Sequence, residues 1–159
     1  MAKQFLRTDN VAKRILSVKF VRHMDEYPDL SYLGEYSDRA GPNAIVRGAC
    51  RGEFRYFNPA MSGEETGNPD SPRQDYERAE AYNDGQWHMT FCQAIAEVSI
   101  GGVNQRITSG GIGGVESDSD ASHFAELATE ELNDLAGILR QMGFPARVVK
   151  AAIKAADID

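Results

Sequence analysis

The chain has 159 residues, with 17 Lys and Arg against 24 Asp and Glu, and a formal net charge of −7. This length suits one domain whose core needs no metal or disulfide, so we expect residues 1–159 to form a single domain. No apolar run approaches the ~18 residues of a membrane span, the N-terminus lacks an apolar signal core, and the two cysteines cannot make a disulfide framework. These features exclude a membrane-spanning protein and predict a cytoplasmic one.

Charge is distributed unevenly along the sequence. Residues 1–24 carry six basic side chains and one acidic one, whereas residues 25–143 carry eight arginines, no lysine and 21 acidic side chains. A surface of one sign speeds the encounter with an oppositely charged partner. The alternative interpretation is a solvated surface that keeps the protein soluble.

The N-terminal quarter of the chain predicts one strand. Residues 14–24 alternate in polarity, with Leu16, Val18 and Phe20 on one side, which is typical of a half-buried strand. Residues 30–36 form an apolar and aromatic cluster that is too short to predict an element of its own.

The middle of the chain mixes short elements with a long loop. Residues 53–57 predict a strand, while the state of 45–52 stays open because its two glycines each oppose a helix by roughly 1 kcal/mol. Residues 58–72 contain three prolines and no periodicity, and they predict a long mobile loop. Residues 74–83 predict a short helix with Tyr76, Ala79 and Tyr82 on one side.

The clearest signal for paired strands lies at residues 87–108. Residues 87–100 have a strand pattern in which the apolar face changes at Phe91–Cys92, which indicates either a bulge or a central strand covered on both sides. Gly101 and Gly102 then join this strand to residues 103–108, as in a β-hairpin.

Two helices are predicted at the C-terminal end. From residue 121 to 142 apolar side chains recur with a helical period, Gly143 suits a left-handed helix end, and Pro145 prevents continuation. A second helix is predicted over residues 146–156. The predicted fold class is therefore α+β, an antiparallel sheet with a β-hairpin near 87–108 and two C-terminal helices packed on one of its faces.

Residues 109–120 combine a glycine-rich stretch with acidic residues. Backbone N–H groups in SGGIGG (109–114) could approach a phosphate, but no helix begins within the glycines, and the three acids that follow would repel an anion. The acids resemble the start of a calcium loop, yet Gly and Glu are missing at its sixth and twelfth positions. We expect a flexible strand exit at 109–114 and helix capping at 116–120, with a ligand or metal site in 109–120 as the alternative.

No complete catalytic or metal-binding constellation is recognisable. His23, His88, His123, Cys50 and Cys92 show none of the spacings of zinc sites, so we expect no metal and no cofactor. His88-Met89-Thr90 matches the His-x-Thr unit that 2H phosphoesterases use twice, but one imidazole cannot serve as both acid and base. The sequence therefore favours a protein without enzymatic activity.

Aromatic side chains beside acidic ones are the best candidates for contact with another protein, since aromatics are enriched at interface hot spots. The predicted partner-binding residues are Tyr32, Glu35, Tyr36, Trp87, Glu116, Asp118, Asp120, Glu126 and Glu130. Arg47, Arg51 and Arg55 recur every four residues and could touch phosphate, but the overall charge argues against direct nucleic-acid binding.

Four segments together resemble a family of small proteins that are common on phages, plasmids and other mobile elements. They are PDLSYLGEYSD within Asp25–Asp38, RYFNPA (Arg55–Ala60), DYERAEAYNDGQW (Asp75–Trp87) and ITSGGIGGVESDSD (Ile107–Asp120). Gly113 and Val115 stand where members usually have Trp and Ile. The resemblance brings no activity with it, but its genomic setting implies interference with host machinery.

The sequence as a whole predicts a non-enzymatic, acidic protein-binding module. We expect its partner to be a basic protein or nucleoprotein complex of the host, and the resemblance implies an inhibitor of a defence complex such as a CRISPR or restriction system.

Overall fold

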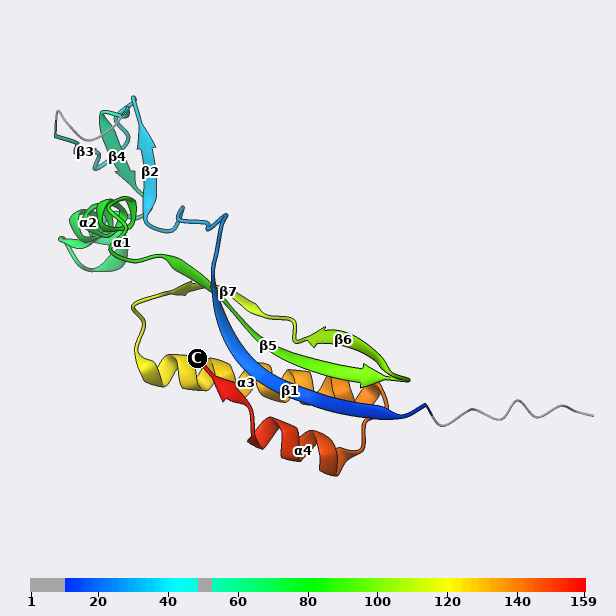
Figure 1. The fold of residues 1–159 in the computed structure, drawn as a ribbon. Helices are drawn as coiled ribbons and strands as arrows, with labels where there is room; N and C mark the ends of the chain where they lie inside the picture. The colour runs from blue at the N-terminus through cyan, green and yellow to red at the C-terminus, as the bar shows by residue number, and fades with distance from the viewer. Residues whose placement is uncertain (1–10, 49–52) are drawn as a thin grey trace, which may run out of the picture. The chain divides into compact units, whose positions relative to one another are not determined.

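The computed structural model describes residues 11–48 and 53–159, and they form two compact units. Each unit is assembled from separate stretches of the chain. Unit 1 consists of Met1–Met24, Thr90–Val115 and Ser119–Asp159, and unit 2 of Asp25–Met89 and Glu116–Asp118. Both contain mainly antiparallel strands together with helices, so the predicted α+β class is confirmed (Figure 1).

Unit 1 is built on a five-stranded sheet with the order β6-β5-β1-β8, in which β7 also pairs with β5. Its strands are β1 (Lys13–Met24), β5 (Met89–Ile100), β6 (Val103–Thr108), β7 (Ile112–Glu116) and β8 (Asp157–Ile158). The predicted hairpin is the β5–β6 pair, and Gly101 and Gly102 in its turn both have positive φ, which glycine adopts without steric penalty.

The predicted strand over residues 14–24 is confirmed as β1, with one irregularity. The register against β5 passes from Ile15↔Val98 to Ser17↔Glu97, so Leu16 is an extra residue, and its side chain is 50% exposed. The bulge therefore lies in β1, and the pairing of β5 with β1 runs through residues 91–92 without a break. Of the alternative prediction, a central strand covered on both sides, the central position is confirmed, since β5 pairs with β1, β6 and β7.

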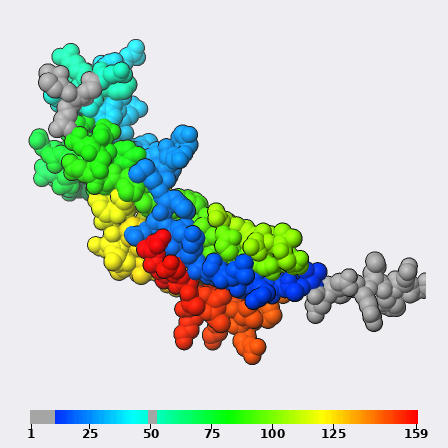
Figure 2. All heavy atoms as spheres, in the orientation of Figure 1, coloured from blue at the N-terminus to red at the C-terminus, as the bar shows by residue number. Residues whose placement is uncertain are grey.

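Helices α3 (Ala121–Gln141) and α4 (Ala146–Lys154) pack on one face of this sheet, as predicted (Figure 1). Leu135 and Leu139 of α3 and Val149 of α4 are fully buried against Val98 of β5. Figure 2 shows the atoms of α4, in orange and red, at the surface beside those of β1, in blue.

Unit 2 combines a small sheet with two helices. The strands β2 (Gly34–Ser37), β4 (Tyr56–Pro59) and β3 (Ile45–Val46) are antiparallel and have the order β2-β4-β3, and the helices are α1 (Gly63–Thr66) and α2 (Ser71–Asn83). Its core consists of Leu33, Phe57, Ala79, Trp87 and Met89. Ala79 is buried, and Tyr76 and Tyr82 pack against this core, so the predicted apolar side of the helix at 74–83 is confirmed.

Three predictions for unit 2 need correction. Residues 34–37, predicted to be too short for an element, form β2 because they pair with β4. The strand predicted at 53–57 begins only at Tyr56. Segment 58–72, predicted as a loop, contains part of β4, the one-turn helix α1 and the start of α2. No helix in the described part of the chain is long and apolar enough to cross a membrane.

Candidate functional site

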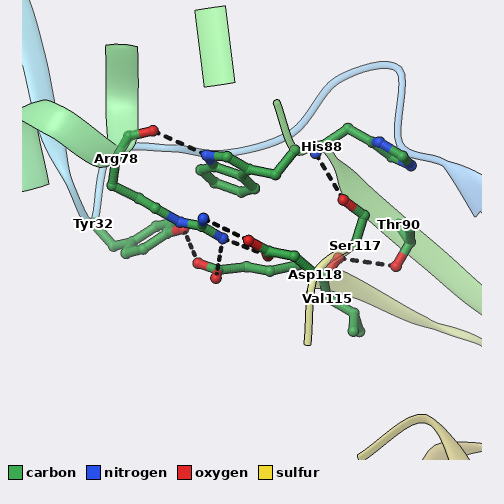
Figure 3. Close-up of polar contacts among 9 residues, drawn as sticks. Tyr32, Arg78, His88, Thr90, Val115, Ser117 and Asp118 are labelled. Carbon is green, nitrogen blue, oxygen red and sulfur yellow. Dashed lines mark hydrogen bonds and ion pairs between the residues drawn. The ribbon is translucent and has the colours of Figure 1, made fainter. Parts of the chain in front are cut away.

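Four of the predicted contact residues meet in unit 2 around Arg78, which lies on α2 (Figure 3). The guanidinium of Arg78 donates two parallel hydrogen bonds to Asp118, from Nη1 to Oδ2 at 2.7 Å and from Nη2 to Oδ1 at 2.6 Å. Nη2 also donates to Oε2 of Glu116 at 2.6 Å. Such fork-shaped pairing is the strong form of the arginine–carboxylate contact and fixes the orientation of both partners.

The indole of Trp87 forms the floor of this cluster. The guanidinium carbon of Arg78 lies 3.8 Å from the centre of the Trp87 ring, and Nε1 of Trp87 donates to the carbonyl oxygen of Arg78 at 3.0 Å. A cation above the face of an indole is held by the ring quadrupole. Trp87 is only 2% exposed, so it is a core residue of unit 2 rather than a surface contact.

Tyr32 closes the cluster from the loop before β2. Its hydroxyl donates to Oε1 of Glu116 at 2.7 Å, while the residue remains 48% exposed. Partial burial and the bond to Glu116 raise the pKa of the phenol well above its usual value of 10. Tyr32 therefore stays protonated, and its role in the cluster is that of a donor.

The electrostatics of the cluster are those of a fixed ionic clamp. The hydrogen bonds to Asp118 are the largest cause of a raised pKa for Arg78, and the same contact lowers the pKa of Asp118. One guanidinium faces two carboxyl groups. The clamp joins α2 to residues 116–118, which are also held by bonds from Ser117 N to His88 O at 2.8 Å and from His88 N to Ser117 Oγ at 2.9 Å.

Tyr36 lies in a second polar cluster of unit 2. Its hydroxyl donates to Glu80 Oε1 at 2.8 Å and accepts from Nδ2 of Asn83 at 2.8 Å. Nη2 of Arg47 donates to the same Glu80 oxygen at 3.0 Å, and the Arg47 guanidinium lies 4.2 Å from the centre of the Tyr36 ring. The Arg47 side chain is 8% exposed, so its interpretation as a phosphate contact is wrong. Arg51 lies outside the described residues.

Backbone N–H groups of the glycine-rich segment donate hydrogen bonds to carboxyl groups of the protein itself. The N–H of Gly111 donates to Oε2 of Glu131 at 2.9 Å, and the N–H of Gly110 donates to Oδ2 of Asp134 at 3.1 Å. The hydroxyl of Ser109 also donates to Glu131, which is 5% exposed. The N–H groups of Gly110 and Gly111 therefore already have carboxyl acceptors from α3. Ile112, Gly113 and Gly114 belong to β7, so the prediction of a flexible exit over 109–114 is wrong for these three residues.

The acidic residues at 116–120 do not act as the predicted helix caps. Asp120 stands at the N-cap position of α3, but its side chain makes no capping hydrogen bond. Glu116 and Asp118 face Arg78 instead, because their stretch of chain belongs to unit 2.

The remaining predicted contact residues are exposed. Glu35 is on β2 of unit 2, whereas Asp120, Glu126 and Glu130 belong to unit 1. The predicted set is thus divided between the two units.

Net charge follows the two units. Unit 2 contains 15 acidic and six basic residues, whereas unit 1 contains nine acidic and 11 basic residues. The basic residues of β1 and α4 offset the acids of α3 within unit 1. Unit 2 alone is therefore the acidic part of the protein.

The surroundings of the candidate metal ligands and of the His-x-Thr unit do not indicate a metal or catalytic site within the described residues. Within 11–48 and 53–159 no three His, Cys, Asp or Glu side chains are grouped as a metal site would require. Cys50 lies outside the described residues, and burial raises the pKa of the Cys92 thiol. The Thr90 hydroxyl donates to the carbonyl oxygen of Val115 at 2.9 Å (Figure 3).

Arg78 is the residue of this cluster that the sequence did not predict. It is separated from Glu116 and Asp118 by 38 and 40 residues, and no spacing rule connects residues that far apart. Comparison of the chain with protein-family models, curated proteins and solved structures gives no match.

Proposed function

We propose that this protein is a non-enzymatic protein-binding module that presents the acidic surface of unit 2 to a basic protein or nucleoprotein complex of a host cell. Its proposed action is that of an inhibitor of a defence complex, such as a CRISPR or restriction system. The observation that carries the proposal is the excess of 15 acidic over six basic residues in unit 2. Such a field steers an oppositely charged partner and disfavours acidic competitors.

The carboxylates available to a partner are not those of the Arg78 clamp. Glu26, Glu35 and Asp38 are exposed, and no basic side chain of the described ranges forms an ion pair with them. Asp29 is exposed and its hydrogen-bond partner is Ser31, whose backbone N–H donates to Oδ1 of Asp29 at 2.9 Å. These four residues lie in one stretch of 13 residues, before and within β2 and just after it. We therefore place the contact surface on residues 26–38.

The alternative, a ligand or metal site in 109–120, has less support. The N–H donors of Gly110 and Gly111 are bonded to Asp134 and Glu131, and Glu116 and Asp118 are bonded to Arg78. A ligand would have to displace these internal partners.

The test of the contact surface is capture of a partner by two matched variants. The first is the triple variant Glu26→Gln, Asp29→Asn and Glu35→Gln in unit 2, and the control is Asp120→Asn, Glu126→Gln and Glu130→Gln in unit 1. Both remove three negative charges from exposed positions. We expect the immobilised unit 2 variant to lose a host protein that the wild type and the control retain at low salt. Equal capture by both variants, or capture that is insensitive to ionic strength, would contradict the proposal.

The defence role has its own test. We expect cells that carry an active CRISPR or restriction system to accept a targeted plasmid when they express the wild-type chain, and to reject it when they express the unit 2 variant. Rejection in the presence of the wild-type chain, tested with each system, would refute inhibition of these systems.

A further inference from the structure

An open groove of about 260 Å³ lies between helices α3 and α4 of unit 1, and it has an apolar floor and a basic rim. Ala136, Val149 and Ile153 line its floor, and Arg140 and Lys150 stand at its rim. Arg140 uses Nε to donate to the Ala136 carbonyl oxygen at 3.1 Å, which positions the guanidinium at the groove. The volume is below the roughly 300–1,000 Å³ of sites for small molecules and suits one large side chain.

The two charged residues that line this groove, Arg140 and Lys150, are both basic. No Asp or Glu occurs from residue 135 to 156, whereas Arg140, Arg147, Lys150 and Lys154 do. Within the described residues no carboxylate forms an ion pair with Arg140 or Lys150. The groove therefore suits an apolar side chain that has acidic residues on either side of it in the sequence.

Unit 2 presents such a group in Tyr27. Its side chain is 90% exposed, although tyrosine usually buries much of its ring. It stands in the sequence Asp25-Glu26-Tyr27-Pro28-Asp29, in which Glu26 and Asp29 are exposed. An exposed aromatic ring flanked by carboxylates matches a groove with an apolar floor and a basic rim in both shape and charge.

We propose that the occupant of the groove is a second copy of this chain, whose Tyr27 inserts between α3 and α4 while Glu26 and Asp29 face Lys150 and Arg140. Each copy then offers one knob, in unit 2, and one groove, in unit 1, so the contact joins the knob of one copy to the groove of another. The contact area is small and its rim is charged, so the association is weak and decreases with salt. Glu26 and Asp29 also belong to the contact surface proposed above, so self-association and a host partner compete for it, and the purified chain alone tests the self-association.

The experiment is sedimentation of purified full-length chains over a wide concentration range, at about 0.01 M ionic strength, where charges act over roughly 30 Å. We expect the average mass of the wild type to rise above that of the monomer with increasing concentration, and to fall back towards the monomer in high salt. The knob variant Tyr27→Ala and the groove variant Arg140→Glu/Lys150→Glu are each expected to stay monomeric alone. Mixed together, they should form a 1:1 complex that grows no further, because one retains an intact groove and the other an intact knob.

Two controls separate this contact from general charge effects and from misfolding. Arg147→Glu/Lys154→Glu makes the same charge change on α4 away from the groove lining, and Phe54→Ala removes another exposed aromatic ring. We expect both controls to associate within about twofold of the wild type. The 1:1 complex itself shows that both half-blocked variants are folded. A wild type that stays monomeric, a mixture that forms no complex, or a control that loses association as fully as the knob variant overturns the proposal.

Discussion

The guanidinium of Arg78 ties together segments of unit 2 that are far apart in sequence. Its bonds to Glu116 and Asp118 and its position over Trp87 hold residues 116–118 against α2. The chain contains no other Trp, so the fluorescence of this indole reports directly on the clamp.

We expect Arg78→Ala to destabilise the protein by about 2–4 kcal/mol. The loss combines hydrogen bonds between charged groups, worth roughly 1.5–3 kcal/mol, with a cation–π contact of about 0.5–1 kcal/mol. Urea unfolding followed by Trp87 fluorescence measures it. Arg73→Ala is the control on the same helix, because the Arg73–Glu77 pair is exposed and contributes at most about 1 kcal/mol. Equal losses in both variants would show that the clamp adds nothing beyond a surface ion pair.

Asp118 gives the clamp a pH dependence of known sign. Arg78 lowers the pKa of Asp118 below its usual 3.8 in the folded state. Because the pKa of Asp118 is lower in the folded state than in the unfolded state, its contribution to the free energy of unfolding is fully present above the unfolded-state pKa. The contribution is lost as pH falls through the folded-state pKa. We therefore expect wild type to be more stable than Asp118→Asn at neutral pH, and the difference to vanish below the folded pKa. Urea midpoints measured from pH 7 to pH 2 test this, and a constant difference contradicts it.

Glu131 and Glu130 are neighbours on α3 with opposite environments. Glu131 is buried and accepts bonds from Ser109 and Gly111, whereas Glu130 is exposed. Each buried polar group that loses its partner costs about 1–3 kcal/mol, so we expect Glu131→Ala to destabilise by at least about 2 kcal/mol. Glu130→Ala should change stability by less than about 0.5 kcal/mol. Similar thermal midpoints for the two variants would argue against a structural role for Glu131.

At the scale of elements, substitution by alanine should have opposite effects on stability at two glycines, Gly137 inside α3 and Gly143 just after its end. Gly143 has φ of +85°, and Gly143 N and Phe144 N donate to the carbonyl oxygens of Arg140 and Leu139, which is the Schellman helix end. Gly137 lies inside the helix with open space at its Cβ position. We expect Gly143→Ala to destabilise by roughly 1–2 kcal/mol and Gly137→Ala to stabilise by roughly 0.5–1 kcal/mol. Thermal unfolding decides, and a shift of the same sign in both would refute the assignment.

The elements that sequence predicted well are those whose pattern extends over many residues. The apolar period of α3 spans 21 residues and its end is marked by Gly143 and Pro145, so its boundaries agree within one residue. Strands β2, β3 and β4 have two to four residues, which is too short for a period of two to be visible. Strand β7 contains Gly113 and Gly114, which conceal its pairing with β5.

One missed element did carry a sequence signal. Ser62 and Glu65 form a capping box in which Ser62 Oγ accepts from Glu65 N and Glu65 Oε2 accepts from Ser62 N. The Ser-x-x-Glu spacing in segment 58–72 is a known mark of a helix start. The Arg78 clamp had no such signal, since its spacing reflects how distant segments meet in unit 2.

At the scale of the whole molecule, the run of acids along the sequence is divided between the two units. Folding assigns residues 119–143 to unit 1, where basic residues of β1 and α4 offset their charge, and leaves the excess of acids in unit 2. Charge counted along a chain thus predicts the charge of a unit only where the fold keeps neighbouring residues in the same unit. Of the predicted contact residues, the proposed surface at 26–38 keeps Tyr32, Glu35 and Tyr36.

The single domain predicted from chain length leads to a prediction about cooperativity. The chain passes between the units four times, after Met24, Met89, Val115 and Asp118, so neither unit is one continuous segment. Residues at the points where the chain changes unit are hydrogen-bonded; for example, Asp25 N donates to Met89 O at 2.8 Å in unit 2. The segments of each unit are connected to one another only through segments of the other unit. This connection favours a single cooperative unfolding transition of both units.

We therefore expect one unfolding transition seen by two independent signals. Helical ellipticity reports mainly on α3 and α4 of unit 1, and Trp87 fluorescence reports on unit 2. Arg78→Ala and Glu131→Ala, although placed in different units, should each shift both signals together, and calorimetric and van't Hoff enthalpies should agree. If Arg78→Ala lowers the Trp87 midpoint while the ellipticity midpoint stays in place, the units unfold separately and the single-domain prediction is wrong.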